Sequence, residues 1–258
     1  MSVLEVAGIG KRYGELSVLE DIAFSVSRGE FLSVIGPSGC GKSTLFHVIG
    51  GLTGGYAGRV LVNGTPVVGR SAAIGMVFQE ESTFPWRTVI ENVALPLELR
   101  KVPRLERLER ARDLVRLVGL AGFEQRYPSE LSGGMRQRVS LARTLAMKPE
   151  ILLMDEPFAS LDEQTRMLLG DKVLQIQQEL TQTTLLITHS ITEAVQLSDR
   201  IVVMTYRPGR IKAIYDIDLP RPRTADVLTS PAFGQYVADI WNDLRDEATR
   251  GMLAAESR

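Results

Sequence analysis

Gly36-Pro37-Ser38-Gly39-Cys40-Gly41-Lys42-Ser43-Thr44 is the stretch that decides the fold of this 258-residue chain. It matches G-x-x-x-x-G-K-[ST], a loop whose backbone N–H groups surround phosphate oxygens. The apolar run Phe31–Ile35 before it predicts a strand, and the apolar spacing after Thr44 predicts a helix that stops at Gly50. A phosphate group would therefore meet the positive end of a helix.

Two side chains of this loop indicate what it binds. Lys42 would reach the β- and γ-phosphates of a nucleotide, and the Ser43 hydroxyl would ligate Mg²⁺. A glycine-rich turn without a ligand is the alternative, but packing alone does not require Lys42 and Ser43 at these positions.

For Cys40 we expect Lys42 and the helix N-terminus to lower the pKa of the thiol and so favour the thiolate. Bound ATP would then block alkylation of Cys40. The alternative is that Cys40 is only a small residue of the loop.

Composition restricts the class of protein. Net charge is −1, which gives no argument for a nucleic-acid partner, and the one cysteine excludes an intramolecular disulfide. Residues 1–5 lack the basic start and long apolar run of a signal peptide. No apolar run approaches the roughly 18 residues of a membrane span. We expect a cytoplasmic protein that reaches any membrane through a partner.

Strands alternate with helices along the chain, which predicts an α/β fold with a parallel sheet. Asn63-Gly64 predicts a hairpin turn within 58–68, residues 90–145 are expected to be helical, and 166–180 to form a helix. The other strand-like segments are Val3–Val6, Ile22–Val26, Ile74–Phe78, Ile151–Met154, Thr184–Thr188, Ile201–Met204 and Ile211–Ile217.

Two helical segments show an apolar face, which most often packs against the rest of the chain. One lies in the helical region, and its charged residues are expected to face solvent. The apolar residues of this face are Leu105, Leu108, Ala111 and Val115. The other segment begins at the predicted N-cap Ser230, with Pro231 as its first helical residue. The residues of its apolar face are Phe233, Tyr236, Val237, Ile240, Trp241 and Leu244.

Three further motifs accompany the loop. Leu131–Arg138 opens a helix after a small-residue turn, which is either a second anion site or an ordinary N-capped helix. Asp155-Glu156 ends a buried strand, where one carboxylate can hold Mg²⁺ through water and the other can polarise an attacking water. His189 follows another strand, at a place suited to a γ-phosphate contact, although a lone histidine is more often structural.

Together these motifs resemble the ATP-binding cassette of ABC transporters over nearly the whole chain. The order is that of the family: phosphate loop, Gln79, Leu131-Ser132-Gly133-Gly134, Asp155-Glu156, Ala159-Ser160-Leu161-Asp162 and His189, with Tyr13 at the place of the adenine-stacking aromatic residue. Met135 departs from the commonest signature, which has glutamine there, and so removes a polar side chain.

The resemblance implies a site shared between two protomers of a head-to-tail dimer that binds two ATP. Glu156 would act as the general base or orient the water, His189 would hold the γ-phosphate, and Gln79 and Lys42 would join them in catalysis. Ser43, Gln79 and Asp155 would surround Mg²⁺. The residues implied to face the partner protomer's nucleotide are Ser132, Gly133, Gly134 and Asp162.

The resemblance also implies a domain organisation. The fold would be a P-loop NTPase (RecA-like) core with an N-terminal antiparallel β subdomain and an inserted α-helical subdomain. Residues 1–220 would form the ATPase domain, with 1–79 and 146–220 as core and β subdomain and 80–145 as the helical subdomain. Residues 221–258 would form a C-terminal helical tail.

Two stretches look like those of the bacterial nitrate, sulfonate and taurine importer branch: Phe84–Val93 and Arg207–Ile211. A single cassette per chain makes a homodimer the default assembly, and this resemblance implies a place at the cytoplasmic face of the inner membrane. The protein would drive uptake of a small anion through a separate permease, with an extracytoplasmic solute-binding protein as an indirect partner. Trp86 and Arg87 would lie near the groove that receives the permease; alternatively, Trp86 packs beneath the helical segment.

Two other functions remain open. A soluble cassette ATPase could act on ribosomes or DNA, but such proteins resemble tandem cassettes or carry a long coiled-coil insert, which this chain lacks. The second open function is a regulatory ATP-binding module with little hydrolysis, but the presence of Glu156 and His189 argues against it. A kinase or GTPase is disfavoured by the signature at Leu131–Gly134.

Overall fold

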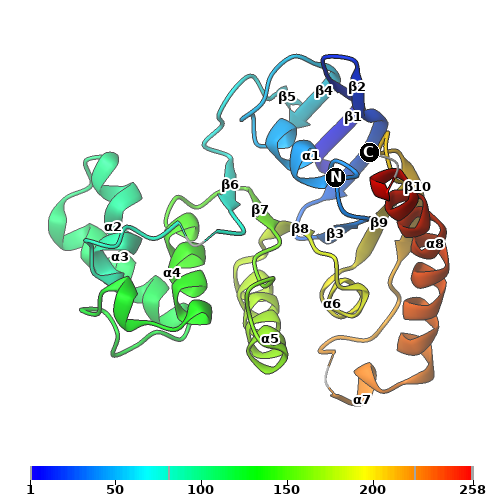
Figure 1. Cartoon of the computed structure of the whole chain (residues 1–258). Helices are drawn as coiled ribbons and strands as arrows, with labels where there is room; N and C mark the ends of the chain where they lie inside the picture. The colour runs from blue at the N-terminus through cyan, green and yellow to red at the C-terminus, as the bar shows by residue number, and fades with distance from the viewer. Residues whose placement is uncertain (1, 81, 224, 257–258) are drawn as a thin grey trace. The chain divides into compact units, whose positions relative to one another are not determined.

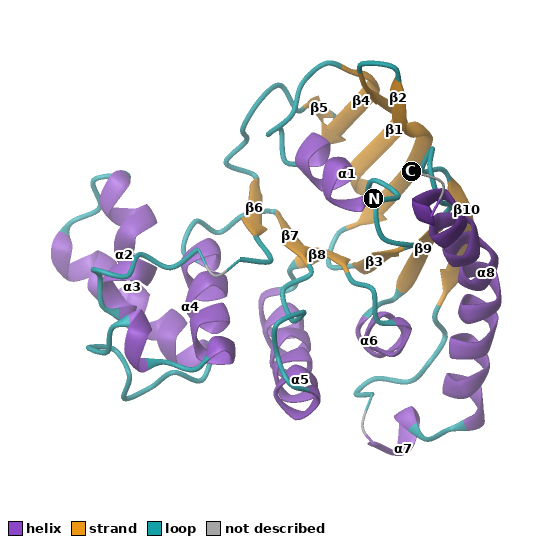
Figure 2. Ribbon diagram, viewed as in Figure 1, coloured by secondary structure: helices purple, strands orange, loops and turns teal. Residues whose placement is uncertain are grey.

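A computed structural model describes residues 2–80, 82–223 and 225–256. The chain folds into two compact units, of which unit 1 comprises Met1–Ser71 with Thr183–Arg258, and unit 2 comprises Ala72–Gln182. Figure 1 follows the chain through its elements, and Figure 2 separates helices from strands. None of the helices among the described residues is long and apolar enough to cross a bilayer.

Unit 1 contains most of the strands. Its elements are β1 (Ser2–Tyr13), β2 (Leu16–Ser27), β3 (Phe31–Ile35), α1 (Lys42–Ile49), β4 (Tyr56–Val62), β5 (Thr65–Pro66), β8 (Thr183–Ile187), α6 (Ile191–Leu197), β9 (Arg200–Met204), β10 (Ile211–Asp216), α7 (Ala225–Leu228) and α8 (Pro231–Glu256).

Unit 2 is mainly helical. Its elements are β6 (Ile74–Val77), α2 (Val89–Leu99), α3 (Arg104–Leu117), the 3₁₀ turn η1 (Pro128–Glu130), α4 (Gly133–Leu145), β7 (Ile151–Asp155) and α5 (Glu163–Leu180). Each strand expected from the sequence is present, and β1 and β2 are longer than expected.

The strands of unit 1 form two kinds of sheet. An antiparallel sheet has the order β2-β1-β4-β5, with the Asn63-Gly64 turn joining β4 to β5 as predicted. In the second sheet β3 lies between β8 and β9, parallel to both, and β10 adds antiparallel to β9. In unit 2, β6 and β7 pair in parallel. The α/β prediction, with an antiparallel N-terminal sheet and a parallel sheet around the loop, is confirmed. The functional boundaries at 79, 145 and 220 stay a prediction.

Burial explains why these segments are strands. Every residue of β3, β7 and β8 is buried, as expected for parallel strands that are covered on both faces. In unit 1, α8 runs alongside β9 and β10 (Figure 2), and Phe233 and Ile240 of α8 pack into a core cluster with Ile35 and Val203. The tail helix therefore docks on the sheet that carries the phosphate loop, as its apolar face predicted.

Two apolar residues on the predicted packing faces do not pack. Leu105, in the first turn of α3, is 86% exposed, whereas Ala111 and Val115 farther along that helix are buried. Trp241 on α8 is 53% exposed. Helical spacing places a residue on a face, but it does not say how far the neighbouring element extends along that face. The prediction was therefore wrong at these two positions.

Candidate nucleotide-binding site

The phosphate loop between β3 and α1 has glycine where the backbone leaves no room for a side chain. A Cβ on Gly36 would lie 2.9 Å from the Cys40 Sγ, and one on Gly41 would lie 2.8 Å from the Leu19 Cδ2. Gly41 also has φ of +105°, which other residues rarely adopt. Steric packing inside unit 1 therefore sets the path of the loop.

The charge of the loop comes from Lys42 and from the start of α1. The Lys42 side chain folds back over the loop, where its Nζ donates to the carbonyl oxygens of Gly36 at 2.8 Å and Pro37 at 3.2 Å. Among the described residues, no side chain caps the N-terminus of α1, and its first turn contains no acidic residue. A buried ammonium group and the positive end of a helix thus meet at one place, which favours an anion such as a phosphate.

Cys40 corrects one expectation from the sequence. Its side chain has no exposed surface, and burial raises the pKa of the thiol, although Lys42 and Arg207 act in the opposite direction. Desolvation of the thiolate outweighs the positive charges near it. Cys40 is thus a neutral packing residue of the loop, and the expectation of a reactive thiolate was wrong.

His189 reaches the same edge of the sheet as the loop. β3 and β8 are parallel, and Val34 pairs with Ile187, so that the residues directly after both strands lie at one end of the sheet. His189 is exposed there, just before Ser190, which caps α6 by accepting a hydrogen bond from the Glu193 N–H. His189 and the phosphate loop thus follow the same end of two neighbouring strands within unit 1.

Tyr13 ends β1 and is half exposed, as a base-stacking residue would need to be. The Lys11 Nζ lies 4.9 Å from the centroid of its ring and is held by the carbonyl oxygens of Gly54, at 2.6 Å, and Gly55, at 3.1 Å. A cation over an aromatic face is attracted by the ring quadrupole. Lys11 therefore orients Tyr13, a role that sequence reasoning missed because Gly54 and Gly55 are more than forty residues away from it.

Gln79 and Glu156 both follow the same end of two paired strands in unit 2. Val77 of β6 pairs with Met154 of β7 in a parallel register, so Gln79 and Glu156 each lie two residues beyond the paired positions. Asp155, between Met154 and Glu156, is buried at the end of β7. Glu156 has φ of +45°, a left-handed conformation that is unfavourable for a non-glycine residue and that clusters at functional sites.

The signature residues form the start of α4, also in unit 2. Ser132 is exposed and caps the helix by accepting a hydrogen bond from the Met135 N–H at 3.3 Å. A Cβ on Gly134 would lie 2.8 Å from the Thr165 Cγ2, so glycine is what allows α4 to approach α5. Ser132, Gly134 and Met135 line a cavity of about 280 Å³ with residues of α5.

Asp162 has a local role that the sequence did not reveal. It caps α5 by accepting a hydrogen bond from the Thr165 N–H at 2.9 Å, and this bond is the main reason that the pKa of its carboxyl is lowered. The side chain is exposed, so the cap also leaves it accessible. The contact of Asp162 with a partner protomer stays a prediction.

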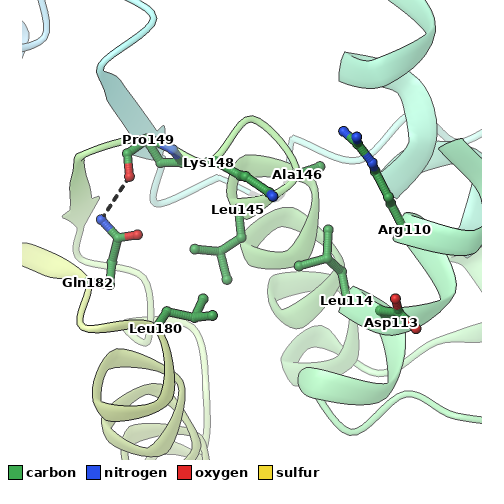
Figure 3. A pocket seen from close by; sticks show the side chains of 9 residues that line it. All are labelled: Arg110, Asp113, Leu114, Leu145, Ala146, Lys148, Pro149, Leu180 and Gln182. Carbon is green, nitrogen blue, oxygen red and sulfur yellow. Dashed lines mark hydrogen bonds between the residues drawn. The ribbon is translucent and has the colours of Figure 1, made fainter. Parts of the chain in front are cut away.

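A larger cavity of about 470 Å³ in unit 2 contains none of the predicted site residues. Figure 3 shows its lining, in which Leu114, Leu145 and Leu180 come from three different helices, with Arg110 and Lys148 beside them. The Gln182 Nε2 donates to the Pro149 carbonyl oxygen at 3.1 Å across one side.

Ser43, Gln79 and Asp155, the residues expected around Mg²⁺, each carry an oxygen donor of the kind that this ion prefers. Mg²⁺ usually takes one or two protein ligands and completes its octahedron with phosphate oxygens and waters. Ser43 is exposed in the first turn of α1, beside the anion site, and offers a hydroxyl oxygen. Within the described ranges 2–80, 82–223 and 225–256, no group of three acidic, histidine or cysteine residues could hold a metal alone. An ion bound jointly with a nucleotide suits this set.

Comparison with known proteins gives relatives of one kind. A sequence profile described as ABC transporter matches residues 19–159, more than half of the chain. An uncharacterized ABC transporter ATP-binding protein of Methanocaldococcus jannaschii is 51% identical, covering 92% of this chain and 88% of its own. An aliphatic sulfonates import ATP-binding protein of Bacillus licheniformis is 47% identical (87% and 86% covered). A taurine import ATP-binding protein of Burkholderia pseudomallei is 48% identical (81% and 81%).

Solved structures agree with these relatives. CbiO1 of Clostridium perfringens, part of the CbiONQ ABC transporter complex, superposes with a TM-score of 0.77 at 28% identity, covering 83% of this chain and 88% of its own. A dimeric ATP-binding cassette in a post-hydrolysis state, bound to ADP and phosphate, superposes with a TM-score of 0.71 at 30% identity, covering 83% and 98%.

Proposed function

Because the chain belongs to the ABC transporter family of ATP-binding proteins, we propose that it drives import of a small sulfonate-type anion, such as taurine, or of nitrate. It is an ATPase of the ABC type and an ATP-binding subunit of the importer kind. The observation that carries the substrate class is the identity of 47–48%, over most of both chains, with sulfonate and taurine import proteins.

In the proposed mechanism the residues that follow the strand ends have different roles. Lys42 and the N-terminus of α1 bind the phosphates, Tyr13 stacks on the base, and His189 contacts the γ-phosphate. Glu156 takes the proton from the attacking water or orients it. Mg²⁺, when bound, neutralises charge on the phosphates. The residues that would surround the ion are Ser43, Gln79 and Asp155.

The proposed assembly is a head-to-tail homodimer. Ser132, Gly133 and Gly134 of one protomer would face the nucleotide on the phosphate loop of the other, with Asp162 beside them. Two observations support this: Ser132 is exposed at the N-terminus of α4 and lines a cavity, and a structural relative is a dimer with ADP and phosphate. Helix N-termini bind anions, so the Ser132 end of α4 is suited to a partner's phosphates.

The proposed partner at the membrane is a separate permease, and the protein would lie at its cytoplasmic face. Trp86 is 70% exposed, so the alternative that it packs beneath the helical segment is wrong. Its ring contacts Phe84 at 5.5 Å between centroids, and Arg87 is held by Glu98 at 3.2 Å. An exposed, supported tryptophan is typical of an interaction surface. The solute-binding protein would act only through the permease, and no nucleic acid is involved.

Glu156→Gln tests the catalytic assignment. The amide cannot accept the proton of water, so we expect ATP turnover to fall by at least about a hundredfold while ATP binding remains. Phosphate release and equilibrium binding measure the two effects. Glu109→Gln, on the exposed face of α3, makes the same chemical change away from the site and should hydrolyse ATP like the wild type. Equal turnover in both variants would contradict the role of Glu156.

The same variant tests the assembly. Without hydrolysis the closed dimer should persist in ATP, and we expect a polytopic permease and a solute-binding protein to copurify from native membranes. Binding of taurine or nitrate to that solute-binding protein would then identify the anion class. Copurification of ribosomal or DNA-repair proteins without a permease would overturn the importer and support a soluble cassette ATPase.

A further inference from the structure

The turn between β9 and β10 is built against the phosphate loop. Gly209 of this turn donates its N–H to the Val18 carbonyl at 2.8 Å, and its carbonyl accepts the Glu20 N–H at 3.0 Å. A Cβ on Gly209 would lie 2.2 Å from the Cys40 carbonyl oxygen. The turn is thus wedged between β2 and the loop, and all of these groups lie in unit 1.

Arg207 of the same turn holds one peptide group of the loop. Its Nε donates to the Gly39 carbonyl at 2.6 Å, and its guanidinium fills the space where a Cβ on Gly39 would lie, 3.0 Å from Nη2. In a trans peptide the C=O and the next N–H point in opposite directions. The bond at Gly39 therefore turns the Cys40 N–H to the other side, where it meets the Pro37 carbonyl at 3.3 Å.

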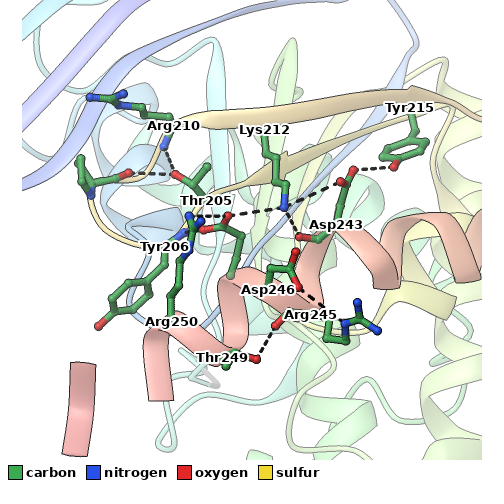
Figure 4. Close-up of polar contacts among 12 residues, drawn as sticks. Thr205, Tyr206, Arg210, Lys212, Tyr215, Asp243, Arg245, Asp246, Thr249 and Arg250 are labelled. Carbon is green, nitrogen blue, oxygen red and sulfur yellow. Dashed lines mark hydrogen bonds and ion pairs between the residues drawn. The ribbon is translucent and has the colours of Figure 1, made fainter. Parts of the chain in front are cut away.

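The end of α8 holds the residue next to Arg207. The Tyr206 N–H donates to the Glu247 Oε2 at 2.9 Å, and Glu247 is buried between Lys212, at 3.5 Å, and Arg250, at 3.2 Å. Figure 4 shows this network between α8 and the β9–β10 turn. Gly251 allows the close approach, since a Cβ there would lie 3.1 Å from the Tyr206 ring.

We propose that Arg207 is a positioning residue for the phosphate loop, and that Glu247 on α8 keeps Arg207 in place. The link runs from α8 to the Tyr206 N–H, along the chain to Arg207, and then to the Gly39–Cys40 peptide. It rests on the proposed role of the loop in binding nucleotide phosphates. The C-terminal helix then acts on nucleotide affinity without touching the nucleotide.

The chemistry explains why this contact would matter. Phosphate-binding loops direct several backbone N–H groups at one anion. A loop with several conformations must become ordered on binding, which costs free energy. A charged hydrogen bond to Gly39 lowers this cost. The positive charge of Arg207 also lies beside the loop, where it favours anions. Loss of Arg207 should therefore weaken binding of the phosphates, while chemistry at saturating nucleotide continues.

Arg207→Ala tests the first step, with the Mg²⁺ complex of ADP as the probe in calorimetry. Loss of one charged hydrogen bond should raise the dissociation constant about tenfold. KM for ATP should rise similarly, with kcat changed less than about twofold. Arg207→Lys, which keeps a charged donor, should give an intermediate constant. Arg210→Ala is the matched control, because this arginine is in the same turn but its side chain, in the described contacts, pairs with Glu20 and not with the loop.

Glu247→Gln tests the second step and guards against a variant that fails to fold. We expect its dissociation constant to rise as well, with faster hydrogen exchange confined to residues 36–42 and 205–209. The double variant with Arg207→Ala should bind no more weakly than Arg207→Ala alone, because both changes break one link. Additive effects, or an Arg207→Ala constant within about twofold of that of Arg210→Ala, would overturn the proposal. If the wild type does not bind the probe, the proposed function fails instead.

Discussion

At the scale of a single residue, burial of the Cys40 thiol makes the stability of the fold depend on pH. The thiol lies 4.0 Å from the Lys42 Nζ and would collide with any side chain at Gly36. Burial raises its pKa, so the thiol stays protonated in the folded protein at a pH where an unfolded chain has lost this proton. A group of this kind makes stability depend on pH.

We predict that Cys40 costs stability above about pH 9, since the ordinary pKa of cysteine lies near there. The unfolded state then binds fewer protons than the folded state, so the stability that Cys40 contributes is full at lower pH and lost as pH rises. Urea unfolding of wild type and Cys40→Ala between pH 7 and 10 measures this. The advantage of wild type over the variant should shrink with pH, and a constant difference would contradict the prediction.

Helix α6 shows at the scale of an element how the tail supports the site. Arg223 is buried, and its guanidinium donates to the carbonyl oxygens of Val195 at 2.8 Å, Gln196 at 3.1 Å and Ser198 at 2.6 Å. These carbonyl groups belong to the last turn of α6 and its C-cap Ser198, where carbonyl groups lack partners within the helix. Burial, and then the charge of Arg221, lowers the pKa of Arg223 to about 10, so it remains a cation at neutral pH. It stabilises the helix that begins just after His189.

Arg223→Met should lower the free energy of unfolding by about 3 kcal/mol, because buried carbonyl groups lose a charged donor. The shift of the urea midpoint, at an unchanged slope, measures this loss. Arg245→Met is the control, since this arginine is exposed on α8 and pairs with the exposed Asp246 at 3.7 Å. Equal midpoints for the two variants would show that Arg223 does not hold α6.

At the scale of the whole molecule, the residues of the proposed nucleotide site are divided between the two units. Unit 1 contains the phosphate loop, Tyr13 and His189, and unit 2 contains Gln79, Glu156 and the signature helix α4. The two tryptophans of the chain are also divided between the units, and both are exposed: Trp86 in unit 2 and Trp241 on α8 in unit 1. They offer a matched pair for locating the permease surface.

Trp86→Ala should abolish stimulation of ATP turnover by the copurified permease while the basal turnover of the isolated protein is unchanged. Truncation of an aromatic residue that acts as a binding hot spot costs about 2 kcal/mol or more, roughly a thirtyfold loss of affinity. Trp241→Ala should leave the stimulation intact. Turnover of the reconstituted complex measures both, and loss of stimulation by Trp241→Ala alone would place the permease on unit 1.

By itself the sequence determined the elements and the family, since each motif needs only a contiguous stretch. Gly36–Thr44 combines an apolar strand, glycines that let the backbone turn and a lysine, all within local reach. The parallel α/β order and the α8 docking face follow from periodicity in the same way. The position of Gln79 and Glu156 beyond the same end of β6 and β7 also follows, once these two strands are known to be parallel neighbours.

Only the tertiary structure decided properties that depend on residues distant in the chain. The pKa of Cys40 is raised rather than lowered, because the packing around the loop excludes water from the thiol. Leu105 and Trp241 are exposed because, among the described residues, the neighbouring elements leave that part of each face uncovered. The contact of Arg207 with Gly39 joins residues 168 positions apart. Desolvation and close approach of this kind are set by the folded neighbours, and no local pattern encodes them.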